Sequence, residues 1–262
     1  MKSGRITALF AALLLAVFTA ASCVTTNGGM VAQEDKDALP GPQLVTHAWM
    51  LITGFKADPE AIKSMLPPGL EPHPDGKCVL NMYTVPNPQL TSGFGAYTLT
   101  YLTVEIAGHD SYTMGAPTGY PGRYFVAYFN SSPVMREFTK GVGIPAEPGM
   151  TTINVKNGKL KAVLEVGGKP FIEATANVGE EFVGTGGGHL NYFGLIRGSR
   201  KNQVVKYPIP WVGSFVKTEN VDVKFLMPED HPIHKLSPKS VDWSVWMNGS
   251  FVYPQHQVIH EY

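Results

Sequence analysis

Short apolar segments, separated at regular intervals by glycine and proline, dominate this chain. Its 262 residues include 28 glycines and 21 prolines, which lie along the whole sequence instead of gathering in one linker. Such punctuation is typical of many short strands that are joined by turns. No repeat of fixed period and no linker interrupts residues 44–262. We therefore expect one mainly β domain over these residues, a closed or nearly closed barrel with one or two short helices.

The clearest strand candidate is Ala96–Ala107, whose side chains alternate between two faces. Asn157-Gly158 and Gly167-Gly168 are strong hairpin signals and predict a meander around them. The other expected strands are His47–Phe55, Lys77–Val85, Tyr124–Phe129, Met150–Val155, Leu160–Val166, Pro170–Val178, Leu190–Ile196, Asn202–Tyr207, Ser214–Phe225, Val241–Asn248 and Val252–Glu261.

Two short helices interrupt this pattern. Pro59–Leu66 follows Asp58, which can cap it, and Val134–Lys140 follows an Asn-Ser-Ser-Pro turn. Two glycine-containing stretches, Gly108–Gly122 and Val183–Gly188, are expected to be loops.

Several function classes lack support in the composition. Lys+Arg and Asp+Glu both number 21 and no basic block occurs, which argues against binding of nucleic acid. His231 and His234 flank a proline without the spacing of a metal site, so no metal and no cofactor are expected. Ser131 and Ser132 lack the Gly-x-Ser-x-Gly elbow of serine hydrolases. Cys78 has no mature cysteine partner and is expected to be a buried thiol.

The first 23 residues are typical of an export signal. Lys2 and Arg5 precede the apolar run Ile6–Thr19, and small residues precede Cys23 as in a bacterial lipobox. We therefore expect a lipoprotein of the periplasm or outer membrane that is acylated at Cys23, with an ordinary secreted protein as the alternative. Residues 24–43 would be the polar tether, with the membrane contacted only through the lipid.

Three segments and the central strand at residues 96–107 resemble the acetoacetate decarboxylase-like superfamily in order and spacing. The segments are ITGFKADPEAIKSMLPPGLEP (residues 52–72), YFVAYFNSSPVMREFTKGVGIPAEPG (residues 124–149) and the C-terminal VIHEY (residues 258–262). The resemblance covers about residues 44–262 and implies the fold of that family. Some members form large assemblies, so a homo-oligomer is compatible with the resemblance.

The resemblance also implies a site and a departure from the family's chemistry. In the family, the first lysine of a Gly-Phe-Pro-Lys-Lys loop forms a Schiff base with the substrate's keto group. Gly143-Ile144-Pro145 matches that loop, which places Ala146 on the Schiff-base position and Glu147 on the second lysine. Since alanine cannot form an imine, we expect no lysine chemistry at this position.

Other residues are candidates by the same resemblance. Arg136 and Glu137 match an Arg-Glu pair of the family, and Lys56 matches an active-site arginine on its first strand. The family's acidic residue near Tyr97 is replaced by Leu99. Lys140, in a segment that is about two residues longer than in the family, is a candidate replacement amine, as is Lys56.

Two functions remain open. In the first, the chain is a lyase (a carbon–carbon lyase or hydro-lyase) that acts on a small oxo acid or related carbonyl compound. Arg136 or Lys56 would hold a carboxylate, Glu147 would act as acid or base, and Tyr120 or Tyr124 would donate to the carbonyl oxygen. In the second, the chain is a non-catalytic lipoprotein whose pocket, which includes Tyr97, binds an apolar or carboxylated small ligand.

Overall fold

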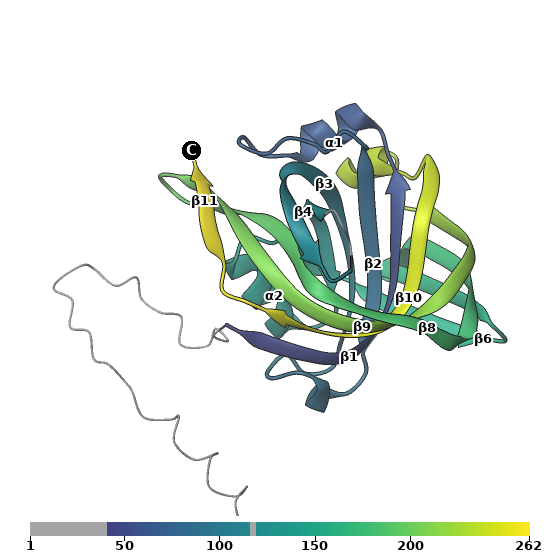
Figure 1. The fold of residues 1–262 in the computed structure, drawn as a ribbon. Helices are drawn as coiled ribbons and strands as arrows, with labels where there is room; N and C mark the ends of the chain where they lie inside the picture. The colour runs from purple at the N-terminus through teal and green to yellow at the C-terminus, as the bar shows by residue number, and fades with distance from the viewer. Residues whose placement is uncertain (1–40, 116–118) are drawn as a thin grey trace, which may run out of the picture. The chain divides into compact units, whose positions relative to one another are not determined.

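From residue 41 onward the chain is built mainly from long strands (Figure 1). This computed structural model describes residues 41–115 and 119–262. The expected signal with Cys23, and all of the expected tether up to residue 40, lie outside the described residues. The strands are β1 (Gln43–Lys56), β2 (Lys77–Val85), β3 (Tyr97–Thr113), β4 (Tyr120–Asn130), β5 (Ala146–Pro148), β6 (Met150–Lys156), β7 (Lys159–Val166), β8 (Lys169–Arg197), β9 (Asn202–Phe225), β10 (Ser240–Tyr253) and β11 (Gln257–Glu261).

The strands form one sheet that closes into a ring. Neighbours follow the order β11-β9-β10-β1-β2-β3-β4-β8-β7-β6, and an additional pairing of β8 with β9 joins this order into the ring. The β4–β5 and β4–β8 pairings are parallel, whereas the other strand pairings are antiparallel. The expected mainly β, single-domain class with short helices is thereby confirmed.

Two short α-helices and two 3₁₀ segments accompany the sheet. They are α1 (Pro59–Met65), α2 (Pro133–Gly141), η1 (Pro88–Leu90) and η2 (Pro232–Leu236). The Asp58 carboxylate accepts hydrogen bonds from the first-turn amides of α1, and the Ser132 hydroxyl accepts one from Met135 N in α2. Both helices therefore begin where a side chain satisfies free amides, as the sequence predicted. Among the described residues, no helix is long and apolar enough to cross a membrane.

Side chains on the two faces of the sheet form two separate apolar clusters. On β3, Tyr97, Leu99 and Tyr101 belong to what we call the inner cluster, together with Met135 of α2. Leu102, Val104 and Ile106 belong to the outer cluster, which also contains buried residues of α1, β7 and η2. A β-strand alternates its side chains between two faces, so each long strand contributes to both clusters. Cys78 is fully buried in the outer cluster, as expected.

The two stretches expected to be loops are largely strand, so those predictions were wrong. β3 continues to Thr113 and β4 begins at Tyr120, which leaves only a short connection within the expected loop 108–122. Residues 183–188 lie within β8 and pair with β9. At Gly186 the missing side chain leaves room for the ring of Phe215 on β9. Glycine there permits close cross-strand packing instead of ending the strand.

Two pairs of short strands that the sequence predicted are each merged into one long strand. Pro170–Val178 and Leu190–Ile196 belong to the 29-residue β8, and Asn202–Tyr207 and Ser214–Phe225 belong to the 24-residue β9. The register of β8 against β9 shifts near Asn177 and Phe182. Such irregularities let one long strand bend around the ring instead of stopping.

Candidate functional site

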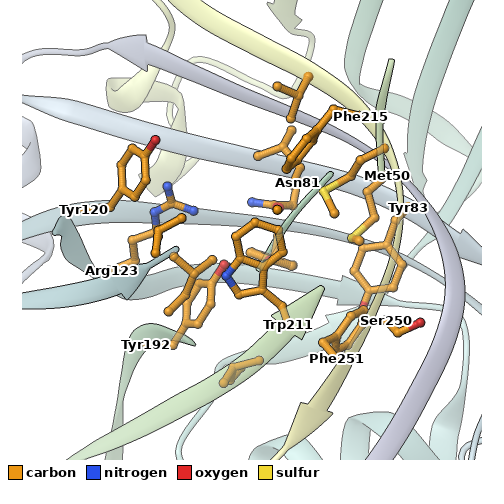
Figure 2. Close-up of a pocket in the computed structure, with 18 of the residues that line it drawn as sticks. Met50, Asn81, Tyr83, Tyr120, Arg123, Tyr192, Trp211, Phe215, Ser250 and Phe251 are labelled. Carbon is orange, nitrogen blue, oxygen red and sulfur yellow. The ribbon is translucent and has the colours of Figure 1, made fainter. Parts of the chain in front are cut away.

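The ring encloses a cavity of about 630 Å³ that is open to solvent. Its lining comes from β1, β2, β3, β4, β8, β9 and β10 and is mainly apolar and aromatic (Figure 2). A few polar side chains interrupt this lining, notably Arg123 and Asn81. An apolar pocket with a small number of convergent polar groups is the usual form of a small-molecule site.

Arg123 is the only charged residue among the described residues that line the cavity. It lies on β4, faces the same side as Phe125, and is only 4% exposed. Its guanidinium carbon lies 5.9 Å from the ring centroid of Trp243. The Trp243 indole occupies the space beside Gly54 that a Cβ atom would take. Glycine at position 54 therefore leaves room for the Trp243 ring, which lies close to the Arg123 guanidinium.

Glu105 is the acidic residue nearest to Arg123 in the sheet, since the two residues are paired between β3 and β4. Burial raises the pKa of Glu105, while the positive charges of Arg123 and Lys77 act in the opposite direction. Burial alone would lower the pKa of Arg123, but Tyr192 and Glu105 favour the charged form, and the pKa of Arg123 is raised. Arg123 is therefore a permanent cation at the cavity wall.

Hydrogen-bond donors without a partner gather at this cavity. Within residues 41–115 and 119–262, they are Arg123 Nε, Asn81 Nδ2, Trp211 Nε1 and the Thr113 hydroxyl. No carboxylate of the described residues forms an ion pair with Arg123. Because buried donors are normally satisfied, these groups fit a ligand that is rich in acceptor oxygens.

Buried tyrosines form part of the cavity wall, with Tyr192 near Arg123 and Tyr83 at the other end (Figure 2). Tyr83 OH lies 3.1 Å from Tyr97 OH and 3.0 Å from Tyr253 OH, and Tyr101 OH lies 3.0 Å from Tyr192 OH. Burial raises the pKa values of Tyr83, Tyr97, Tyr101 and Tyr253. These phenols are neutral at physiological pH and can donate or accept hydrogen bonds.

The residues predicted at the Schiff-base loop lie outside the cavity lining. Ala146 begins β5, is paired with Tyr128 of β4, and is buried in the inner cluster. The next residue, Glu147, is exposed. Tyr97 lies in the inner cluster, where its hydroxyl contacts Tyr83, and it does not line the cavity. Of the predicted substrate-binding residues, Tyr120 alone lines the cavity, and it is also partly exposed.

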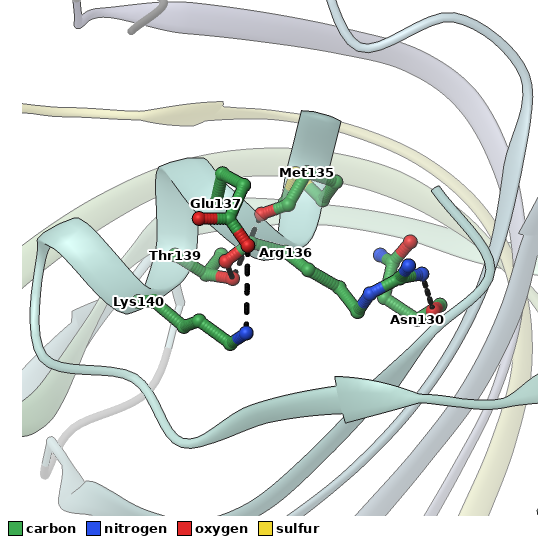
Figure 3. Close-up of polar contacts among 6 residues, drawn as sticks. All are labelled: Asn130, Met135, Arg136, Glu137, Thr139 and Lys140. Atoms are coloured by element: carbon green, nitrogen blue, oxygen red, sulfur yellow. Dashed lines mark hydrogen bonds and ion pairs between the residues drawn. The ribbon is translucent and has the colours of Figure 1, made fainter. Parts of the chain in front are cut away.

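The predicted residues of α2 lie at the surface (Figure 3). Arg136 donates a hydrogen bond of 2.8 Å to the carbonyl oxygen of Asn130. Lys140 Nζ is 3.4 Å from a carboxylate oxygen of Glu137, and the Lys140 side chain is 52% exposed. These groups thus have partners of their own, in contrast to the donors in the cavity.

Tyr124 and Lys56 are also placed away from the cavity. Tyr124 follows Arg123 on β4, so it points to the opposite face, where it belongs to the outer cluster. It lines a second, smaller pocket of about 340 Å³ together with Lys140. Lys56 is exposed at the end of β1. The roles of these residues stay predictions, because no contact with a substrate tests them.

Sequence reasoning missed Arg123, Asn81 and Trp211. The sequence predicts a strand that begins at Tyr124, one residue after Arg123, because Gly122 ends a glycine-containing stretch that is typical of a loop. Extending the alternation of β4 back by one residue would have placed an arginine on the same face as Phe125 and exposed the signal. Asn81 sits within an apolar strand, where a polar side chain facing the ring is the informative exception.

Comparison with known proteins agrees with this fold. Residues 30–262 match the model of the family described as acetoacetate decarboxylase (ADC). This chain belongs to the acetoacetate decarboxylase family. The family match confirms the resemblance inferred from the sequence motifs. The sequence matches no curated protein.

Solved structures of family proteins share the architecture at low identity. An acetoacetate decarboxylase superposes with a TM-score of 0.72 at 14% identity, covering 86% of this chain and 92% of that chain. The acetoacetate decarboxylase of Legionella pneumophila gives 0.70 at 15% identity, covering 92% and 99%. The enduracididine biosynthesis enzyme MppR, complexed with pyruvate, gives 0.64 at 15% identity, covering 86% and 93%. At these identities the likeness is one of fold.

Proposed function

We propose that this protein binds a small oxo acid or a related carboxylate in the ring cavity, and that it does so without forming a lysine imine. The observation that carries this proposal is Arg123, a buried cation that lines an apolar cavity and whose Nε has no partner among the described residues. A guanidinium presents a planar fork of donors that matches a carboxylate.

The donors of Asn81 and Trp211 could bind a second oxygen-bearing group of the same ligand. Asn81 and Trp211 line the same cavity as Arg123, and their donors Nδ2 and Nε1 have no partner among the described residues (Figure 2). A keto oxygen adjacent to a carboxylate would accept from such donors while the carboxylate accepts from Arg123. Binding would therefore satisfy several donors at once, in surroundings where water competes poorly. The related MppR, which was solved with pyruvate, supports an oxo acid as the ligand.

The lining favours binding without an imine. Among the described residues no lysine lines the cavity, and its one cation, Arg123, has a raised pKa and provides no free amine. Ala146 offers only a methyl group within the inner cluster. If the ligand is transformed, the polar groups available for proton transfer at the cavity are phenols such as Tyr192 and Tyr101.

The test is calorimetric titration of the protein with pyruvate and 2-oxobutanoate. Arg123→Met keeps the apolar stem but removes the charge, and we expect affinity to fall about 10- to 150-fold, the value of a charged hydrogen bond. Arg197→Met is the matched control, because Arg197 lies at the second pocket. Equal affinities of the wild type and Arg123→Met would refute the proposal.

The absence of an imine is tested separately by borohydride reduction in the presence of each oxo acid. Mass spectrometry should find no reduced adduct on any lysine. An adduct on Lys140 or Lys56 would overturn this part of the proposal and restore either residue as the replacement amine.

Binding without turnover, by a lipoprotein, is the second candidate function. It is favoured by the lining of the cavity, in which the described residues include no lysine, histidine, aspartate or glutamate. NMR of pyruvate or acetoacetate incubated with the protein should then show no product, and any protein-dependent product would favour the lyase. In cells, Cys23→Ser should release the protein from the membrane fraction if Cys23 is acylated.

A further inference from the structure

The cavity is much larger than a short oxo acid requires. Its volume of about 630 Å³ lies within the range of roughly 300–1,000 Å³ of pockets that bury drug-sized ligands. An oxo acid of three or four carbons has only about six or seven non-hydrogen atoms, so it would occupy a small part of such a pocket. The rest of the space is bounded mainly by apolar and aromatic side chains, and tyrosine hydroxyls among them are hydrogen-bonded to one another.

The charged residue and most of the labelled apolar residues lie at different ends of the cavity, and the hydroxyl-bearing residues Tyr83 and Ser250 also lie at the apolar end (Figure 2). Arg123 and Tyr120 lie on one side, Asn81 and Trp211 project near the middle, and Met50, Phe215 and Phe251 lie on the other side (Figure 2). Met247 adds a second thioether to the lining. A ligand whose carboxylate contacts Arg123 therefore extends, if it is long enough, onto a surface of methionine and aromatic side chains.

Paired glycines create the room for this apolar surface. Gly213 of β9 and Gly249 of β10 are opposite each other in the sheet. A Cβ atom at either position would overlap the methyl end of Met247, and one at Gly249 would also overlap that of Met50. Both methionines thus lie flat over a patch of bare backbone. Unbranched thioether side chains adjust readily to the shape of an apolar ligand.

The solvent-exposed edge of the cavity also carries large apolar side chains. Met114 and Tyr120 line the cavity and are also exposed, with 63% and 48% of their surfaces accessible. Exposed large apolar side chains at the mouth of a pocket are typical of sites for apolar ligands.

From these observations we infer that the ligand is an amphipathic carboxylate, namely an oxo acid that bears a medium-length alkyl chain or an aryl group. Its carboxylate contacts Arg123, and its apolar body lies along Met50, Met247, Phe215 and Phe251. The placement of the carboxylate rests on the proposed function, whereas the apolar body follows from the size and lining of the cavity.

The experiment is a calorimetric series with straight-chain 2-oxo acids of four, six and eight carbons. Each methylene group that becomes buried should raise affinity about three- to fourfold. The eight-carbon acid should then bind on the order of 100-fold more tightly than the four-carbon acid. A flat series would overturn the inference.

Met50→Trp locates the apolar body, because the larger side chain fills the space expected for the tail. It should lower the ratio of eight-carbon to four-carbon affinity at least tenfold. Met150→Trp is the matched control, since Met150 is exposed on β6 outside the cavity and should leave the ratio as in the wild type. An unchanged ratio in a folded Met50→Trp protein would place the tail elsewhere and contradict the inference.

The two proposals fail in different ways. If the acids bind with dependence on Arg123 but without dependence on chain length, the amphipathic ligand is excluded and carboxylate binding stands. If affinity rises with chain length but Arg123→Met leaves every acid unaffected, the carboxylate assignment fails and an apolar ligand remains.

Discussion

The cavity wall around Arg123 and the surface of α2 both carry an arginine, but the two arginines have opposite surroundings. Arg123 is buried, and its Nε is without a partner among the described residues. Arg136 is half-buried and donates to a backbone carbonyl, and its neighbours Glu137 and Lys140 pair with each other at the surface. A buried donor without a partner carries a desolvation penalty, which a ligand that accepts its hydrogen bond would remove. A donor that already has a partner gives a ligand no such gain. Likeness to the family motifs predicted a functional site at α2, whereas the burial of Arg123 indicates a site in the cavity.

The largest expected effect is that of pH on the free energy of unfolding, through the buried tyrosines on the cavity side of the comparison. Burial raises the pKa values of several tyrosines, so above about pH 10 the unfolded chain releases phenolic protons that the folded chain retains. Stability should therefore fall as pH rises, by about 1.4 kcal/mol per pH unit for each such tyrosine. The residues concerned are Tyr83, Tyr97, Tyr101, Tyr128, Tyr207 and Tyr253.

Urea unfolding between pH 9 and pH 11, followed with phenolate absorbance, measures this dependence. Tyr207→Phe is a useful variant because the Tyr207 hydroxyl has no hydrogen-bond partner among the described residues. This substitution should make the fall of the free energy of unfolding with pH less steep by the contribution of one tyrosine. A stability that stays constant to pH 11 would contradict the burial of these phenols.

The next largest effect compares the two arginines directly. Arg123→Met removes the positive charge that most favours the charged form of buried Glu105, and we expect a loss of about 2 kcal/mol in the free energy of unfolding, less than for breaking a direct buried ion pair. Arg136→Met removes a hydrogen bond at a half-buried site and should cost about 1 kcal/mol. Urea unfolding at pH 7 measures both.

A double variant isolates the cause. Arg123→Met with Glu105→Gln removes both charges and should recover much of the stability lost by Arg123→Met alone. If the two single variants cost the same, the contrast between the buried and the surface arginine disappears.

The smallest effect is expected for the surface pair of α2. Lys140→Met should change the free energy of unfolding by about 0.5 kcal/mol or less, because exposed ion pairs contribute little. It should also leave the affinity for 2-oxobutanoate unchanged, since Lys140 does not line the cavity. A marked loss of affinity would move the site from the cavity toward α2 and restore Lys140 as a functional residue.

Local sequence pattern was sufficient for most of the fold. Alternation identified β3 from its start to Ala107, and the hairpin glycines and helix caps were found from their own residue types. The length of β8 was not predictable, because glycines at 184 and 186–188 remain in the strand only through pairing with β9. That pairing joins residues far apart in the sequence, and a local reading cannot see it.

The candidate site was less accessible to sequence reasoning than the fold. Family motifs drew attention to residues 136–147, which the structure places on α2 and β5. Arg123, Asn81 and Trp211 come from three different strands and become neighbours only when the ring closes. Arg123 and Asn81 each had a local signal, since a polar side chain in phase with apolar strand residues is unusual.

The tyrosines around Ala146 also bear on how this protein can evolve. Ala146 is paired with Tyr128, in a cluster where bulky phenols occupy the interior. A lysine at position 146 would have to place its long side chain among these rings, and close-packed interiors tolerate such enlargement poorly. A functional lysine at position 146 would therefore require several coordinated substitutions that first open space. Alanine at position 146 is therefore fixed by its neighbours as much as by any role of its own.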